Sequence, residues 1–254
     1  MLLKLAIVRA VMHMRCAILA DIHGNLDAFE AVMRDIADRG GVDELWCLGD
    51  VVGYGPEPSA CIALLRQHPH VCVAGNHDWA AVGKLDTEDF NPAAAEACKW
   101  TVGQLSAEDI AYLCDLPLMA TRGEFTIVHG SPRAPLLEYV SNPVRAMVNF
   151  QHFGTMYCFV GHSHVPAVYA DSEGKCFRSA MPPSLQLGAS RLIINPGGVG
   201  QPRDGDPRAA YAIYDEAERV IYSYRISYDI ATVQKKMIAS GLPEFLSLRL
   251  SEGL

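Results

Sequence analysis

Aspartate, asparagine and histidine residues gather in five short segments of this sequence, and their side chains are common ligands of divalent metal ions. The segments are Asp21-Ile22-His23, Gly49-Asp50, Gly75-Asn76-His77-Asp78, His129-Gly130 and Gly161-His162-Ser163-His164. Imidazole, carboxylate and amide oxygen together favour manganese, iron, zinc or nickel over calcium or magnesium. The segments therefore predict a site for two divalent transition metal ions, with manganese as the first expectation and one carboxylate bridging the pair.

Such a pair of ions has a characteristic chemistry. Two metals about 3.5–4 Å apart can bind a phosphate, acidify a bridging water and stabilise an in-line displacement. Each residue alone has a simpler interpretation, since a lone histidine is more often packed or exposed, and Asp21 or Asp50 could cap a helix or form a turn. Five of the nine histidines lie in these segments. Because buried charges need partners, the combination favours a metal site over simple packing.

The elements that must position these segments are strands, because an apolar run precedes each segment. We expect strands at 15–20, 44–48, 71–74, 124–128 and 156–160. Helices at 26–39, with Asn25 as its N-cap, and at 59–67 alternate with the first three strands, which predicts a parallel sheet. Ligand sites in open α/β sheets lie beyond the carboxyl ends of the strands. The five segments are therefore expected to meet at one edge.

The rest of the chain is expected to mix helices and further strands. Residues 92–115 are predicted to be helical, and a helix at 143–152 and a last helix at 229–240 follow. Further strands are predicted at 165–170, 175–178, 191–194, 209–214 and 219–226, with a hairpin turn at Asp171-Ser172-Glu173-Gly174. The predicted fold class is α/β.

Composition narrows the class of protein. The chain has 254 residues, half of them hydrophobic, and a net charge of −8, which argues against a general nucleic-acid surface. Its eight cysteines form no C-x-x-C pair and indicate buried thiols in a reducing compartment. Residues 1–13 are interpreted as an N-terminal extension and 14–254 as one domain. No segment is apolar and long enough to span a membrane, so we predict a cytoplasmic protein.

In this order the five segments resemble the pattern D-x-H, G-D, G-N-H-[D/E], H and G-H-x-H of the calcineurin-like metallophosphoesterase superfamily. The stretches DIHGN, GDVVGYGP, HGSP, INPGGVGQPRDGDPRAAYAIYD and GLPEFLSLRL resemble its YfcE-like phosphodiesterase branch, so the likeness covers about residues 14–251. This resemblance implies a four-layer α/β/β/α sandwich.

The resemblance also implies a role for each site residue. One metal would be held by Asp21, His23, Asp50 and His164. The other would be held by Asp50, Asn76, His129 and His162, so that Asp50 bridges the two. His77 would contact the phosphate and help the leaving group, and Asp78 would orient His77.

The function predicted first is a phosphodiesterase in which a metal-bound hydroxide attacks a small phosphate-ester substrate. Superfamily members with G-D-x-V-D-R-G bind the phosphate through that arginine, and Tyr54 stands in its place here. Tyr54 is thus either a substrate contact or only a packing residue, and Arg133 is the predicted alternative cation. A phosphomonoesterase or protein phosphatase, and a non-catalytic scaffold of the same fold, are the other interpretations. A homo-oligomer is left open.

Overall fold

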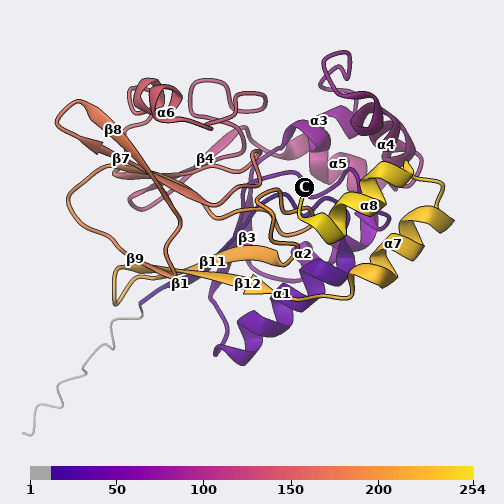
Figure 1. Cartoon of the computed structure of the whole chain (residues 1–254), viewed down its shortest axis with the longest axis horizontal. Helices are drawn as coiled ribbons and strands as arrows, with labels where there is room; N and C mark the ends of the chain where they lie inside the picture. The colour runs from indigo at the N-terminus through magenta and orange to yellow at the C-terminus, as the bar shows by residue number, and fades with distance from the viewer. Residues whose placement is uncertain (1–12) are drawn as a thin grey trace, which may run out of the picture.

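The computed structural model describes residues 13–254, and its strands form two six-stranded sheets (Figure 1). In the first sheet β1, β2 and β3 run parallel, whereas β11, β12 and β9 extend it antiparallel from β1. The order in space is β3 (His70–Cys72), β2 (Glu44–Cys47), β1 (Arg15–Leu19), β11 (Ala209–Asp215), β12 (Val220–Ile226) and β9 (Ser184–Gln186).

The second sheet also contains three parallel strands, but they lie inside the sheet, whereas those of the first sheet lie at one edge. Strands β5, β6 and β10 run parallel, and β4 on one side and β7 and β8 on the other are antiparallel. The order in space is β4 (Met119–Arg122), β5 (Phe125–Val128), β6 (Tyr157–Phe159), β10 (Leu192–Asn195), β7 (Ala167–Ser172) and β8 (Lys175–Ala180).

The main core lies between the two sheets, because alternate residues of each strand point to opposite faces. Ile18 and Trp46 of the first sheet pack there with Phe125 and Phe159 of the second. The outer face of the first sheet is covered by α1 (Leu26–Asp38), α2 (Pro58–Arg66) and α5 (Ala107–Asp115). Helix α6 (Pro143–Asn149) covers the outer face of the second sheet. The predicted four-layer α/β/β/α sandwich is confirmed.

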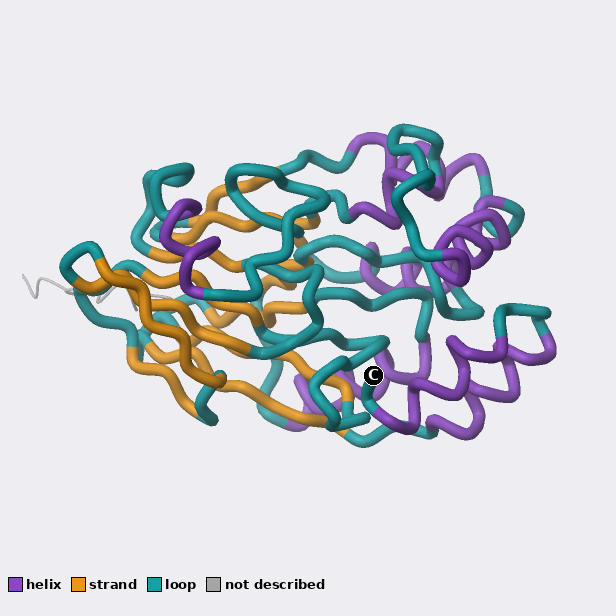
Figure 2. The backbone as a smooth tube through the Cα atoms, turned by 45° about the horizontal axis from the view of Figure 1, so that its top comes forward, coloured by secondary structure: helices purple, strands orange, loops and turns teal. Residues whose placement is uncertain are grey.

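The remaining helices gather beyond one end of the sandwich (Figures 1 and 2). They are α3 (Asn76–Ala81), α4 (Pro92–Val102), α7 (Ile230–Ala239) and α8 (Glu244–Glu252). Helices α4, α7 and α8 share a small apolar cluster with Tyr54, which lies in the loop between β2 and α2. This cluster attaches the C-terminal helices to the loops that follow the parallel strands.

Most expected elements are present with shifts of one or two residues, and Asn25 caps α1 by accepting the Ala28 N–H at 3.1 Å. The expectation that the helix near 229–240 is the last one is wrong. A further helix, α8, follows it, with Pro243 as its N-cap. Strands β4 and β9 and the six-residue helix α3 were not expected either. All three are short, so they carry too little periodicity to predict.

Two further predictions concern the N-terminal extension and membrane-spanning segments. The proposed extension, residues 1–13, lies outside the described residues except for His13. No helix among residues 13–254 is long and apolar enough to cross a membrane.

Candidate metal centre

The carboxyl ends of parallel strands in both sheets deliver the predicted site residues. Asp21 and His23 follow β1, Asp50 follows β2, and Asn76 and His77 begin α3 just after β3. From the second sheet, His129 follows β5, and His162 and His164 follow β6. The predicted ligands therefore converge from five separate segments, and all of them are buried.

Backbone hydrogen bonds hold the loops after β1 and β2 side by side. The N–H of Asp21 donates to the Gly49 carbonyl at 3.1 Å, and the N–H of His23 donates to the Asp50 carbonyl at 2.9 Å. The loop after β3 lies equally close, because a Cβ on Gly75 would come within 2.0 Å of Asp50 Oδ1. Only glycine permits this approach, which explains the residue before Asn76.

The site residues also adopt an unusual backbone conformation. Among the described residues, eight non-glycine residues have positive φ, and six of them belong to the site: Asp21, His23, Asp50, Tyr54, His162 and His164. Each such residue costs on the order of 1–3 kcal/mol, and such strain concentrates at functional sites. The positive φ values at these residues therefore lower the stability of the fold, and they set the directions of the site side chains.

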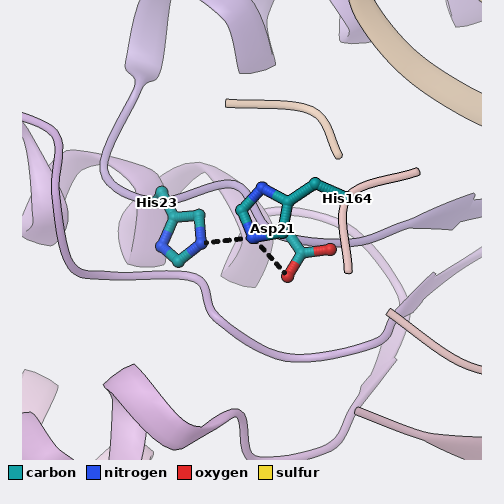
Figure 3. Close-up of side chains that lie close together, drawn as sticks. All are labelled: Asp21, His23 and His164. Atoms are coloured by element: carbon teal, nitrogen blue, oxygen red, sulfur yellow. Dashed lines mark hydrogen bonds and ion pairs between the residues drawn. The ribbon is translucent and has the colours of Figure 1, made fainter. Parts of the chain in front are cut away.

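Asp21, His23 and His164 form the first ligand cluster (Figure 3). His164 Nε2 lies 3.2 Å from His23 Nε2 and 3.3 Å from Asp21 Oδ1. The three side chains come from the ends of β1 and β6, so this cluster joins the two sheets.

Asp50, His129 and His162 form the second cluster. His129 Nε2 lies 3.3 Å from Asp50 Oδ2 and 3.1 Å from His162 Nδ1, and it is 2.9 Å from Asn76 Oδ1. Asp50 Oδ2 is also 3.6 Å from His23 Nε2 of the first cluster. One carboxylate oxygen thus lies between the two groups, as the prediction of a bridging ligand requires.

Backbone carbonyls orient three of the four imidazoles in the two clusters. The Nδ1 atoms of His23, His129 and His164 lie 3.1, 2.9 and 2.5 Å from the carbonyl oxygens of Val52, Leu48 and Gln201. Because a carbonyl only accepts, Nδ1 carries the proton and Nε2 is free to bind a metal. Asp21 Oδ2 and Asp50 Oδ2 are buried and have no hydrogen-bond partner among residues 13–254. These donors fit divalent ions that would neutralise the carboxylates and separate the facing nitrogens.

The electrostatics of the buried site lead to the same conclusion. Burial raises the pKa of Asp21 to about 7 and lowers the pKa of His23, His162 and His164. Burial also acts to lower the pKa of His129, but the carboxylates of Asp50 and Asp21 outweigh it and raise that pKa to about 9. Three imidazoles therefore favour the neutral form, and the carboxylates favour positive charge at the fourth, His129.

His77 lies beside the two clusters and lines the cavity above them. Its backbone N–H donates to Asp50 Oδ1 at 2.9 Å, and its ring centre is 4.4 Å from Tyr54 and 4.9 Å from Phe90. The ring Nδ1 is buried and has no hydrogen-bond partner in the part of the chain that the structure describes. Burial lowers the pKa of His77 to about 4, so the imidazole favours its neutral form. It can donate one hydrogen bond to a group in the cavity.

The carboxylate of Asp78 contacts backbone groups of the neighbouring loops. Its carboxylate accepts the backbone N–H groups of Asp50, Val52 and Gly75, at 2.8, 3.1 and 2.9 Å. Among the described residues no hydrogen bond joins it to the ring of His77, whose Nδ1 has no partner. Asp78 therefore ties the loop after β2 to the loop after β3. It does not orient the imidazole through a contact of its own.

A cavity of about 410 Å³ opens over the site, and one of the two predicted substrate contacts lines it. Tyr54 forms part of its wall, whereas Arg133 does not line it. The guanidinium of Arg133 instead pairs with Glu138. Arg133 follows His129 closely in sequence, but its guanidinium is paired with Glu138 of the same loop and not with a group in the cavity.

Arg203, which sequence reasoning missed as a site residue, lines the cavity. Its guanidinium carbon lies 5.6 Å from the centre of the Tyr54 ring, and its Nη2 donates to Gln201 Oε1 at 2.8 Å. The carbonyl of the same Gln201 orients His164. Arg203 belongs to the stretch GQPRDGDPR, and an arginine after a glycine-rich strand end was the available signal.

The fold and the site define a metal-binding hydrolase that acts on phosphate esters. Residues 14–219 match the calcineurin-like phosphoesterase superfamily domain, and the chain belongs to this superfamily. An uncharacterized protein of Methanocaldococcus jannaschii is 37% identical over 249 residues, which is 93% of this chain and 97% of that protein. The sequence-based resemblance is thereby confirmed for the superfamily.

Solved structures and shorter matches agree with this assignment. The crystal structure of a metallophosphoesterase from Sphaerobacter thermophilus is 45% identical, with a TM-score of 0.85, and the match covers 96% of this chain and all of that one. A symmetrical bis(5'-nucleosyl)-tetraphosphatase of Pseudomonas putida is 34% identical over 77 residues, only 27% of either chain.

Proposed function

We propose that this protein is a dinuclear metal-dependent phosphoesterase that acts on phosphodiesters. The observation that supports a dinuclear site is Asp50 Oδ2. This buried carboxylate oxygen lies between the two ligand clusters and has no hydrogen-bond partner among the described residues. Asp21, His23, Asp50 and His164 would hold one ion, and Asp50, Asn76, His129 and His162 the other. Bound divalent ions would polarise the phosphate ester and acidify water. The nitrogen-rich donor set suits manganese, iron, zinc or nickel.

The chain's own residues would bind and orient the substrate. The ring of His77, at the edge of the clusters, would donate a hydrogen bond to a phosphoryl or leaving oxygen. Arg203 would place positive charge on the same side of the cavity. The carbonyls of Val52, Leu48 and Gln201 would keep the ligand imidazoles in one orientation throughout the reaction.

Cavity size supports the choice of a diester. A volume of about 410 Å³ is within the range of sites for whole small molecules, and leaves room for a second ester group beside the phosphate. The absence of an arginine at position 54 also favours a diester, because a monoester dianion carries an extra charge. Arg203 weakens this second argument, since it brings a guanidinium next to Tyr54 from another loop.

Arg203 is therefore the observation that favours the alternative, a phosphomonoesterase. Guanidinium groups bind phosphate dianions through charge-assisted hydrogen bonds. In that case the arginine after β10 would do what the arginine of G-D-x-V-D-R-G does in other members of the superfamily.

Metal analysis followed by a matched pair of substrates tests the proposal. The protein, purified without chelators and then loaded with manganese, should contain two ions per chain by elemental analysis. It should hydrolyse bis-nitrophenyl phosphate with a kcat/KM about tenfold above that for nitrophenyl phosphate, a difference of about 1.4 kcal/mol. A preference for the monoester that disappears in Arg203→Ala would establish the alternative. Two bound metals without hydrolysis of either ester would overturn both.

A further inference from the structure

Two exposed apolar side chains lie beside the two ligand clusters. Both belong to one loop, residues 130–140, between β5 and α6. Leu137 is 48% exposed and Tyr139 is 41% exposed, and both line the cavity. The Tyr139 ring lies parallel to the ring of the ligand His162, with centres 3.8 Å apart and planes at 12°. The loop thus presents an apolar wall directly beside a metal-binding imidazole.

This loop is held rigidly by the residue between the two apolar ones. Glu138 turns inward, and its Oε2 accepts hydrogen bonds from Ser131 Oγ at 2.6 Å and Asn149 Nδ2 at 2.9 Å. Arg133 completes the network through its guanidinium. Burial acts to raise the pKa of Glu138, but these three partners lower it to about 2, so the carboxylate stays ionised. The hydrogen bonds of Glu138 therefore hold the loop in the conformation that exposes Leu137 and Tyr139.

Hydrogen bonds at both ends of the loop add to this rigidity. The Gly130 N–H donates to the Pro135 carbonyl at 2.6 Å, and the Tyr169 hydroxyl donates to the Val140 carbonyl at 2.9 Å. A rigid loop that keeps two large apolar side chains in solvent gives up the free energy of burying them. Such exposure at the mouth of a polar cavity marks a surface for a ligand.

Besides Tyr139, the aromatic side chains of Tyr54 and Phe90 line the cavity. Phe90, in the segment before α4, lines the cavity with its ring centre 4.9 Å from His77. The cavity therefore combines a floor of metal ligands and His77 with walls that carry the guanidinium of Arg203 and apolar side chains. The floor and Arg203 suit a phosphate, and the apolar side chains need a different chemical partner.

We propose that Leu137 and Tyr139 bind a planar aromatic ester group of the substrate, either an aryl group or a nucleobase. The inference rests on the proposed phosphoesterase function and deepens it. A flat ring would lie against these side chains while the attached phosphate reaches the clusters below Tyr139. Stacking on aromatic side chains is worth about 1–3 kcal/mol for a nucleobase, which corresponds to about tenfold to hundredfold in binding.

Three diesters with the same leaving group test this proposal. Methyl, phenyl and thymidine nitrophenyl phosphates all release nitrophenolate, so they differ only in the group that stays on phosphorus. We expect kcat/KM for the phenyl and thymidine esters to exceed that for the methyl ester by about tenfold or more, mainly through KM. A thymidine ester superior to the phenyl ester identifies a nucleotide, and equal values identify any flat group.

Variants test whether the preference for the phenyl ester over the methyl ester depends on the loop at 130–140. Tyr139→Ala should bring the ratio of phenyl to methyl kcat/KM close to one, whereas Tyr139→Phe should keep it. Phe177→Ala is the matched control, because Phe177 is an exposed aromatic residue of β8 that does not line the cavity. It should leave the ratio unchanged. Equal kcat/KM for the three esters in the wild type, or an unchanged ratio in Tyr139→Ala, overturns the proposal.

Binding of phosphonates separates this proposal from the proposed function. Phenylphosphonate and methylphosphonate carry the same charged group and are not esters. Calorimetry on the metal-loaded protein should show about tenfold tighter binding of phenylphosphonate, with the difference lost in Tyr139→Ala. If no ester is hydrolysed, the proposed function fails, and this measurement still decides the role of the loop. Equal binding of the two phosphonates would refute it.

Discussion

The floor and the walls of the cavity are built in opposite ways. The floor consists of side chains that directly follow parallel strands, in strained conformations and with backbone carbonyls behind the imidazoles. The walls come from the loops at 130–140 and around Phe90 and from the Arg203 loop, and they expose apolar and cationic groups. The difference indicates that the floor determines which reaction is possible, whereas the walls select the molecule that reacts.

Removing the bridging carboxylate is the strongest test of the floor. Asp50→Ala should lose most of the bound metal, because Asp50 Oδ2 lies between both clusters. Turnover should fall by at least about 10³-fold, the scale associated with lost electrostatic stabilisation of a transition state. Elemental analysis and turnover of the purified variant check this. Two metals per chain in Asp50→Ala would contradict the bridging assignment.

His77 should separate metal binding from turnover. His77→Ala is expected to keep two metals per chain and to lower kcat by about 10²–10⁴-fold, the usual contribution of a proton donor or charge stabiliser. The loss should be smaller for substrates with good leaving groups. His77 lies close enough to Asp50 and His23 to be a ligand itself, so metal content is the critical measurement. A variant that loses one ion would make His77 a ligand.

The two arginines offer a matched comparison for the walls. Arg203 lines the cavity and Arg133 does not, so Arg203→Ala should raise KM about tenfold to hundredfold while Arg133→Ala changes it far less. The magnitude follows from about 1.5–3 kcal/mol for a hydrogen bond to a charged group. Steady-state kinetics on one nitrophenyl ester gives both values. A larger effect of Arg133→Ala would restore the original sequence prediction.

Asp78 should affect stability more than chemistry. Asp78→Asn leaves the three backbone N–H groups with a poorer acceptor, and the free energy of unfolding should fall by about 1–3 kcal/mol. Turnover of the metal-saturated variant should stay within about fivefold of wild type. The reason is that Asp78 accepts from backbone N–H groups and, within residues 13–254, His77 Nδ1 has no hydrogen-bond partner. Urea denaturation and kcat measure the two quantities. Normal stability with a loss of turnover like that of His77→Ala would show that Asp78 orients His77.

The floor of the cavity could be predicted from sequence, whereas most of its walls could not. The strands and the ligands at their ends were accessible, because apolar runs followed by Asp21, Asp50 or His129 form local patterns. Arg203 and Tyr139 were not, because their place over the site depends on how loops from the second sheet fold back. Arg133 was predicted as a substrate contact for the same reason, because the sequence does not show that its guanidinium pairs with Glu138. Short elements such as β9, and α8 behind Pro243, lacked a pattern of their own.

The spacing of the ligands along the chain has a consequence for biosynthesis. His23 and His164 meet within 3.2 Å although 141 positions separate them. A growing chain that has emerged only as far as β5 already contains Asp21, His23, Asp50 and Asn76, yet it lacks the imidazoles that follow β6. Neither ligand cluster is complete before the ends of β5 and β6 lie against the ends of β1 and β2. A complete site would therefore require contact between the two sheets, and bound metal would report that contact.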